Sequence, residues 1–211
     1  LSGWDVSDVK NMDNMFQRCS SLTNLEGLEG WKTDSLVSTD SGSSSEWGMF
    51  GYCYGLEDVS ALSGWNMSNV STLRGMFYDC EKLSGISSLS DWNTSSVTSM
   101  ENMFYNCFSL VDITPVLDWN TGKVTRMSGM FRGVQMTSLD ALSDWDVSSV
   151  KEFGTYGLNS TATYMYTYGM FEDCTQLENI DGLSNWNTSS AVDMRSMFRK
   201  CSKLKNVNAL S

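Results

Sequence analysis

The sequence lacks histidine altogether, has a single proline, and is poor in basic residues. Without histidine, the side chain most often used as a general base and as a zinc ligand is missing. The 14 basic residues stand against 25 acidic ones, a net charge of −11, which argues against nucleic acid or an anionic membrane surface as the main partner. No apolar run of 18 residues is present, so we expect no membrane-spanning helix in this segment.

Other signatures of chemistry are also missing. There is no glycine-rich phosphate loop, no Cys-x-x-Cys pair, and no close pair of carboxylates that stands out from the scattered acidic residues. We therefore expect a protein that is not an enzyme and that needs no metal and no other cofactor. The first residues have neither a basic head nor an apolar run, so no signal peptide is recognised.

What the sequence does contain is an internal repeat, marked by the dipeptide Met-Phe. Its spacing is 27 residues, except for two longer intervals of 34 and 40 residues. The methionines of the seven pairs are Met15, Met49, Met76, Met103, Met130, Met170 and Met197. Self-similarity at a fixed period of this length is typical of solenoids.

A tryptophan precedes each Met-Phe pair, by 11 residues in the five copies without an insertion. These tryptophans mark repeats that start near Trp4, Trp31, Trp65, Trp92, Trp119, Trp145 and Trp186. We interpret residues 1–211 as a single repeat array with insertions at 38–46 and 154–168. Because the sequence enters and leaves partway through a repeat, we expect it to be part of a longer chain.

Each repeat predicts one turn of an α/β solenoid. A residue that caps helices stands three positions after each tryptophan, as Ser7 does, and an apolar stripe over Val9, Met12 and Cys19 predicts a short amphipathic helix. A Leu-x-x-Leu-x-x-Leu segment follows and predicts a short parallel strand. Strands pack about 4.8 Å apart and helices 8–10 Å apart, so the stack should bend. We predict a leucine-rich-repeat-like arc of about seven coils; the alternative is a three-sided β-solenoid.

The stretch from Trp92 to Leu110, Trp-Asn-Thr-Ser-Ser-Val-Thr-Ser-Met-Glu-Asn-Met-Phe-Tyr-Asn-Cys-Phe-Ser-Leu, resembles the repeat of BspA-like leucine-rich-repeat surface proteins. These occur as surface lipoproteins of mycoplasmas and in cell-wall proteins of Gram-positive bacteria. The resemblance recurs over nearly the whole chain. It implies an extracellular or cell-surface location and a role in adhesion or partner binding, with no catalytic residues.

Two positions that recur from repeat to repeat, each called a column below, are interpreted as structural. The tryptophans that begin the repeats should stack on their equivalents, whereas exposed rings would instead suit a carbohydrate. The cysteines four residues after each methionine are expected to be buried free thiols, since Val134 takes their place in one copy. These cysteines are Cys19, Cys53, Cys80, Cys107, Cys174 and Cys201.

Departures from the repeat are the candidates for binding. The second insertion carries half of all the tyrosines, in a setting of Ser, Gly and Thr that is typical of binding loops: Tyr156, Tyr164, Tyr166 and Tyr168. The positions between the apolar residues of the extended segment include a candidate acidic face: Glu26, Glu57, Asp58, Asp112, Asp140, Glu178 and Asp181. That face would suit a basic partner, or it keeps the protein soluble. Asn159 is a glycosylation candidate only in a eukaryotic source.

These observations predict a non-enzymatic extracellular repeat protein that acts in adhesion or protein recognition. Its partner would be a protein, or a ligand on a host or matrix surface. The alternative is a structural subunit of a surface layer, filament or appendage, in which copies of the chain stack end to end.

Overall fold

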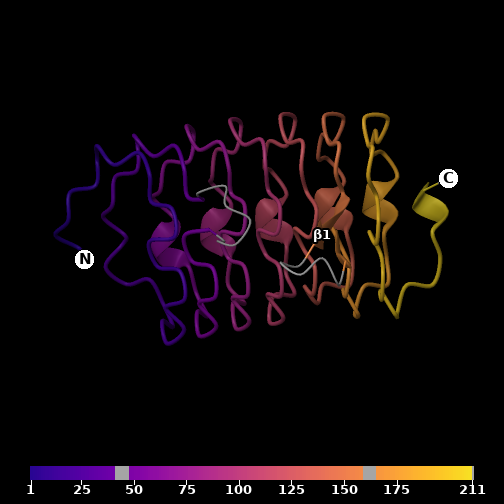
Figure 1. Cartoon of the computed structure of the whole chain (residues 1–211), viewed down its shortest axis with the longest axis horizontal. Coiled ribbons are helices and arrows are strands. Elements are labelled where there is room, and N and C mark those ends of the chain that lie inside the picture. The colour runs from indigo at the N-terminus through magenta and orange to yellow at the C-terminus, as the bar shows by residue number, and fades with distance from the viewer. Residues whose placement is uncertain (41–47, 159–164, 211) are drawn as a thin grey trace.

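The computed structural model describes residues 1–40, 48–158 and 165–210. The chain has a repeat fold: Figure 1 shows successive repeats lying side by side from the N-terminal to the C-terminal end. Parallel bridges join residues one repeat apart, as between Thr72 and Ser99 and between Ser99 and Arg126. Within the described ranges, no helix is long and apolar enough to cross a membrane.

The predicted amphipathic helix is wrong. Within the described residues the only helices are single 3-10 turns, and the segment from Met12 to Cys19 is a series of turns. Its amides alternate between bonds to the third residue back and bonds to the next repeat: Met15 N–H donates to Met12 O at 3.3 Å, and Phe16 N–H to Met49 O at 2.9 Å. Left-handed backbone at Asn14 (φ 57°) prevents a continuous α-helix.

The predicted strand is also shorter than expected. The Leu-x-x-Leu segment makes isolated parallel bridges, such as Asp58 with Gly85, and then enters a 3-10 turn. These turns are η1 (Ser60–Leu62), η2 (Ser87–Leu89), η3 (Thr114–Val116), η4 (Asp140–Leu142), η5 (Asp181–Leu183) and η6 (Asn208–Leu210). The predicted arc required packed helices, which hold neighbouring repeats farther apart on the outer side than strands do on the inner side. The described residues contain no such helices, so the physical reason for an arc no longer applies. The continuous parallel strands of a three-sided β-solenoid are likewise absent from the described residues.

Stacked aromatic rings form the centre of the core. The seven phenylalanines of the Met-Phe pairs stack on their neighbours, with ring centroids 5.6 to 6.1 Å apart and interplanar angles of 1° to 12°. The tryptophans stack in the same manner, as Trp92 does on Trp119 at 6.2 Å. Each repeat therefore buries its apolar edge against the repeat on either side.

The tryptophan rings are interior rather than a binding platform. Five of them are 2% to 4% exposed: Trp31, Trp65, Trp92, Trp119 and Trp145. Trp186 is half-buried, and Trp4, in the first repeat, is 57% exposed. Each buried indole N–H donates to a main-chain carbonyl of the preceding repeat, as Trp119 does to Leu89 at 2.9 Å. The exposed faces that a carbohydrate would need are missing from the five interior rings.

The cysteine thiols form a second column of inter-repeat hydrogen bonds. The Sγ–H of Cys80 donates to Phe50 O at 3.3 Å, and that of Cys107 to Phe77 O at 3.3 Å. Cys53, Cys174 and Cys201 make the same bond, whereas Cys19 is exposed. The equivalent Val134 is fully buried, so a small apolar side chain also fits this position.

The residue directly after each tryptophan shapes the turn that had been assigned to a helix cap. Asn93 Oδ1 accepts the N–H of Ser95 at 3.1 Å, and Asp146 Oδ1 accepts that of Ser148 at 3.0 Å. The residue three after the tryptophan is thus the donor in an Asx turn and does not cap a helix.

Candidate functional site

The second insertion leaves the repeat as a β-hairpin. Strands β1 (Gly154–Leu158) and β2 (Met165–Gly169) pair antiparallel, and Gly154 lies opposite Gly169 at the base of the hairpin. Both glycines press against the backbone of the following repeat: a Cβ on Gly154 would overlap the carbonyl oxygen of Arg195, and one on Gly169 that of Ser196. The base of the hairpin is therefore fixed by packing that only glycine permits.

A buried carboxylate holds the same base. Glu172 is fully buried and accepts the N–H of Gly169 at 3.2 Å. The Arg199 guanidinium donates to Glu172 at 2.7 Å, and Arg132 Nε lies 3.6 Å from it. Two guanidinium groups thus compensate a charge that would otherwise be costly to bury. This arrangement ties β2 to the repeats on both sides.

Tyr168, the penultimate residue of β2, packs on a row of tyrosines from three earlier repeats. Its ring centroid lies 5.9 Å from that of Tyr105, which stacks on Tyr78 at 4.4 Å; Tyr78 contacts Tyr52 at 5.2 Å. The Arg132 guanidinium covers Tyr105 at 4.7 Å, a cation–π geometry. Burial, with Asp79 nearby, raises the pKa of Tyr78 far above its usual range.

The structure therefore divides the predicted binding tyrosines. Tyr168 is half-buried and belongs to the base of the hairpin. Tyr156 and Tyr166 lie in β1 and β2 by their backbone, while their side chains, Tyr164 and Asn159 fall outside the described residues. The sequence reasoning missed Tyr52, Tyr78 and Tyr105. Tyr78 and Tyr105 both stand two residues after the methionine of their repeat, and this shared position is the sequence signal that could have predicted their stacking.

All seven residues of the candidate acidic face are exposed, but four of them take part in local hydrogen bonds or ion pairs. Asp58 and Asp112 accept the N–H of the residue two positions on, at 3.1 and 2.9 Å, and so shape the turn into η1 and η3. Glu57 lies 3.8 Å from Lys82, and Glu178 lies 3.4 Å from Lys205. Glu26, Asp140 and Asp181 are exposed at the position that follows the middle apolar residue of the segment. These carboxylates do not form one uniform acidic row.

The first insertion enters at the same point of the repeat as the second. Ser38 pairs with Asn11 in a parallel bridge, so the repeat register continues into the insertion. Residues 41–47, which make up most of it, fall outside the described residues. Asp40 is 5% exposed and accepts the Arg74 guanidinium at 3.2 Å. Arg74 also lies 3.6 Å from Glu101, whose pKa burial raises.

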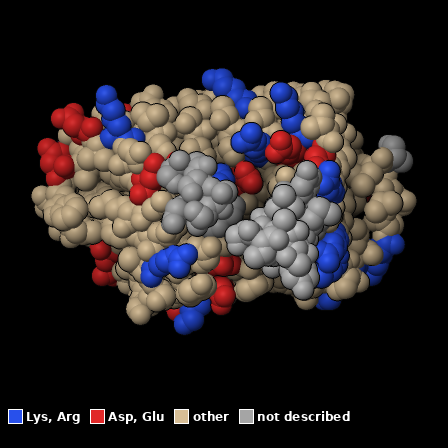
Figure 2. All heavy atoms as spheres, viewed as in Figure 1, with Lys and Arg blue, Asp and Glu red and all other residues tan. Residues whose placement is uncertain are grey.

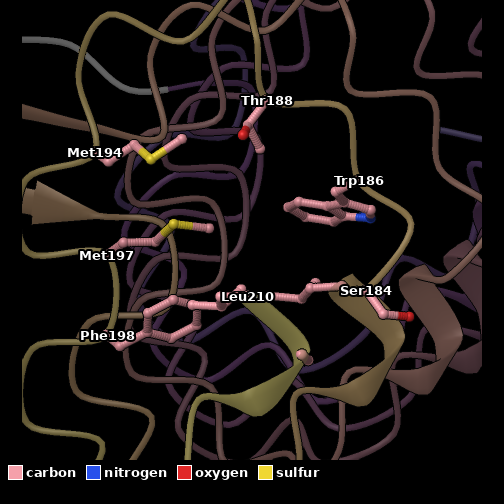
Figure 3. Close-up of a pocket in the computed structure, with 9 residues that line it drawn as sticks. Ser184, Trp186, Thr188, Met194, Met197, Phe198 and Leu210 are labelled. Carbon is pink, nitrogen blue, oxygen red and sulfur yellow. The ribbon is translucent and has the colours of Figure 1, made fainter.

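An apolar hollow of about 420 Å³ lies at the face of the last repeat. Figure 3 shows Trp186, Met194, Met197, Phe198 and Leu210 around it, each directed toward the same opening. In the interior repeats this volume is filled by the aromatic and methionine side chains of the following repeat. The residues at the opposite face, Trp4 and Met15 among them, line a second hollow.

Fold and site together define a repeat protein that carries a firmly anchored hairpin on one side. Three overlapping segments, residues 1–110, 47–164 and 111–209, match the family described as "Mycoplasma protein of unknown function, DUF285". The chain belongs to this family. No curated protein shows a significant similarity to it.

A solved structure with some similarity is an internalin from Listeria monocytogenes. The two chains are 11% identical and superpose with a TM-score of 0.24; the match covers 89% of this chain and spans only 64% of the internalin chain. A similarity at this level does not define the fold or the function of the present chain.

Proposed function

We propose that the chain is a non-enzymatic surface repeat protein, exposed outside the cell, that binds a protein or a host or matrix ligand through the face carrying the β1–β2 hairpin. The array would be one continuous solenoid of the BspA-like kind. Membership of a mycoplasma repeat family supports this proposal. So does the net charge of −11, which disfavours nucleic acid as the partner.

One observation carries the proposal: the base of the hairpin is held by more contacts than a decorative loop needs. Gly154 and Gly169 pack on the next repeat, Glu172 binds the amide of Gly169, and Tyr168 packs on Tyr105. Binding sites gain affinity when the segment that contacts the partner is ordered beforehand, because less conformational entropy is lost on binding. The columns of Trp, Phe and Cys, by contrast, are occupied in packing.

The test replaces the hairpin tyrosines that are not part of the base. The variant Tyr156→Ser/Tyr164→Ser/Tyr166→Ser keeps Tyr168, and Tyr54→Ser, which removes an exposed tyrosine of the second repeat, is the matched control. Beads coated with each protein are scored for attachment to cultured host cells and to immobilised matrix proteins. We expect at least a tenfold loss for the triple variant and none for the control. Wild-type beads that attach to none of these surfaces, or an unaffected triple variant, would overturn the proposal.

A structural role in end-to-end assemblies is the second candidate, favoured by the opposite charges of the two end repeats. Residues 1–30 carry five acidic and two basic side chains, whereas residues 186–211 carry one acidic and five basic. Figure 2 shows acidic side chains near the N-terminal end of the viewed face and basic ones near the C-terminal end. Sedimentation velocity over a range of concentrations tests this role: salt-sensitive polymers support it, and a monomer at every concentration excludes it.

A further inference from the structure

Four of the six arginines of the chain surround the base of the β1–β2 hairpin. They are Arg126, Arg132, Arg195 and Arg199, called the arginine cluster below. Arg126, in the fifth repeat, forms a parallel bridge with Glu152, two residues before β1. The main chain of Arg195, in the seventh repeat, packs against Gly154 at the start of β1. Arg132 and Arg199 come from the same two repeats and reach Glu172, three residues after β2.

The charges around the hairpin are arranged with the carboxylates beneath the cations. The ion pairs are Arg126–Glu152, Arg195–Asp193, Arg199–Glu172 and Lys200–Asp173, with nitrogen–oxygen distances of 2.7 to 3.6 Å. The cationic side chains of these pairs are 46% to 56% exposed, whereas their carboxylate partners are 0% to 36% exposed. This face therefore presents cations to solvent, although the whole chain carries a net charge of −11.

An arginine that is paired with a carboxylate can still contact a second anion. The guanidinium group has five N–H donors, and a carboxylate accepts two of them in the bidentate geometry. The carboxylate also holds the side chain in place, so less conformational entropy is lost when a ligand binds. The planar fork of donors matches the spaced oxygen atoms of carboxylate, phosphate and sulfate groups. The arginine cluster is thus preorganised for an anionic ligand.

We propose that the hairpin face binds a sulfated linear polysaccharide, whose sulfate groups contact the arginine cluster and Lys200. This inference rests on the proposed function, because it names the ligand of the same face. The cations come from two repeats, on both sides of the hairpin, so a ligand with several spaced anionic groups fits them better than a single small anion. The hairpin also carries Tyr156 in β1 and Tyr166 in β2, and tyrosine offers a flat face on which a sugar ring packs.

The absence of an apolar pocket beside the cations favours a polysaccharide over an acidic protein segment. Protein segments gain most of their affinity from a few large side chains that fill pockets. No member of the arginine cluster lines either of the two apolar hollows described above. A ligand that is recognised by its regularly spaced charges needs no such pocket.

The first experiment titrates a heparin octasaccharide into the purified chain and measures binding by calorimetry, at low and at physiological salt. We expect binding that weakens as salt rises, because each contact releases counterions. The desulfated octasaccharide, a peptide of glutamates and a single-stranded oligonucleotide of equal charge should each bind at least about tenfold more weakly. No binding of the heparin octasaccharide, or equal binding of the desulfated one, would overturn the proposal. Equal or tighter binding of the peptide or the oligonucleotide would also overturn it.

The second experiment removes three exposed cations of this face. The variant Arg126→Gln/Arg195→Gln/Lys200→Gln keeps Arg132 and Arg199, which compensate the buried charge of Glu172. We expect about tenfold weaker binding of the octasaccharide, since each exposed ion pair contributes a factor of about two to three.

The matched control is Lys32→Gln/Lys82→Gln/Lys123→Gln. It removes three exposed lysines outside the cluster and lowers the net charge by the same amount. Its affinity should stay within about twofold of the wild type. If both triple variants weaken binding equally, the attraction depends on total charge, and the assignment to the hairpin face is wrong.

Cell attachment separates this inference from the proposed function. Beads coated with the wild-type chain are applied to cultured cells before and after enzymatic removal of their sulfated polysaccharides, and we expect attachment to be lost after removal. Attachment that survives removal but is lost in the Tyr156→Ser/Tyr164→Ser/Tyr166→Ser variant would refute the polysaccharide and leave the proposed function standing. Attachment to no surface at all would overturn the proposed function, and the octasaccharide titration then decides the inference by itself.

Discussion

The Trp, Cys and Thr side chains of the core make hydrogen bonds between repeats rather than within them. Trp119 Nε1 donates to Leu89 O, Cys107 Sγ to Phe77 O, and Thr94 Oγ1 to Asn120 O. The carbonyls of Leu89 and Phe77 also accept a main-chain N–H within their own turns, so each of these side chains adds a second, inter-repeat bond. At the scale of the residue, these side chains therefore replace regular secondary structure as the link between neighbouring repeats.

The variant Trp119→Phe tests this linking role. It removes the indole N–H, leaves the Leu89 carbonyl with the Trp92 N–H as its remaining donor, and opens a small cavity. We expect the free energy of unfolding to fall by about 2–4 kcal/mol. Trp4→Phe is the control, because the Trp4 ring is 57% exposed, and it should change stability by less than about 0.5 kcal/mol. Urea unfolding followed by circular dichroism measures both, and equal effects would count against the hydrogen-bond role.

The buried thiols predict a loss of stability at alkaline pH. Burial raises the pKa of Cys107 well above its usual range, so the folded chain keeps the thiol proton while the unfolded chain loses it above about pH 9. Stability that is complete below this pH should fall as pH rises further, by up to about 1.4 kcal/mol per pH unit for each such thiol. Cys107→Val should reduce this slope, since Val134 occupies the same column. Cys19→Val, at the exposed end of the column, is the control. An unchanged slope for Cys107→Val would contradict the prediction.

Recurrence in the sequence identifies which residues are equivalent, but it does not identify their hydrogen bonds. The columns of Trp and Cys could be aligned by spacing alone. Asn93, the residue after Trp92, shapes the turn, and Ser95 does not cap a helix. Both findings depend on backbone geometry, which composition does not determine. Asp58 and Asp112 were assigned to an acidic face for the same reason, although each shapes a turn.

At the scale of the element, the main error was the helix between Ser7 and Cys19. The apolar spacing of that segment fits a helix, but two positions adopt left-handed backbone in each of the five repeats without an insertion. The first stands directly before the methionine and holds Asn14, Gly48, Gly75, Asn102, Gly129, Gly169 and Ser196. Gly and Asn are the residues that tolerate positive φ, and Asn102 and Gly129 adopt it. This column was the signal against a helix. The hairpin could not be predicted from the repeat, because its strands have no counterpart in the repeats without an insertion.

The variant Gly169→Ala tests how the hairpin is anchored. An alanine Cβ would overlap the main-chain carbonyl of Ser196, so either the hairpin or the last repeat has to move. We expect a loss of about 2–3 kcal/mol in the free energy of unfolding, comparable to overpacking a core. Gly3→Ala, where no atom lies within 4 Å of the added Cβ, is the control and should be neutral. Thermal unfolding measures both, and a Gly169→Ala variant as stable as the control would show that the base of the hairpin is loosely packed.

At the scale of the molecule, the phenylalanine stack connects the first repeat to the last. Each ring contact of a phenylalanine in this stack is with a phenylalanine or a tryptophan of an adjacent repeat, so stability should behave as a sum of repeats and of nearest-neighbour interfaces. A change in an interior repeat then weakens two interfaces, and a change in the last described repeat weakens one. The hairpin that begins at Gly154 leaves this stack uninterrupted, since Phe131 stacks on Phe171 across the insertion.

Substitution of two equivalent phenylalanines measures this dependence on position. Phe104 is fully buried between Phe77 and Phe131, at 5.7 and 5.8 Å, whereas Phe198 stacks on Phe171 as its one ring neighbour among the described residues. Phe104→Ala should cost about 3–5 kcal/mol, and Phe198→Ala at least about 1 kcal/mol less. Hydrogen exchange gives the spatial readout: faster exchange should spread to the repeats on both sides of Phe104 but stay within the last two repeats for Phe198. Equal costs and a uniform rise in exchange would mean that the chain unfolds as one cooperative unit, in which case position along the stack does not matter.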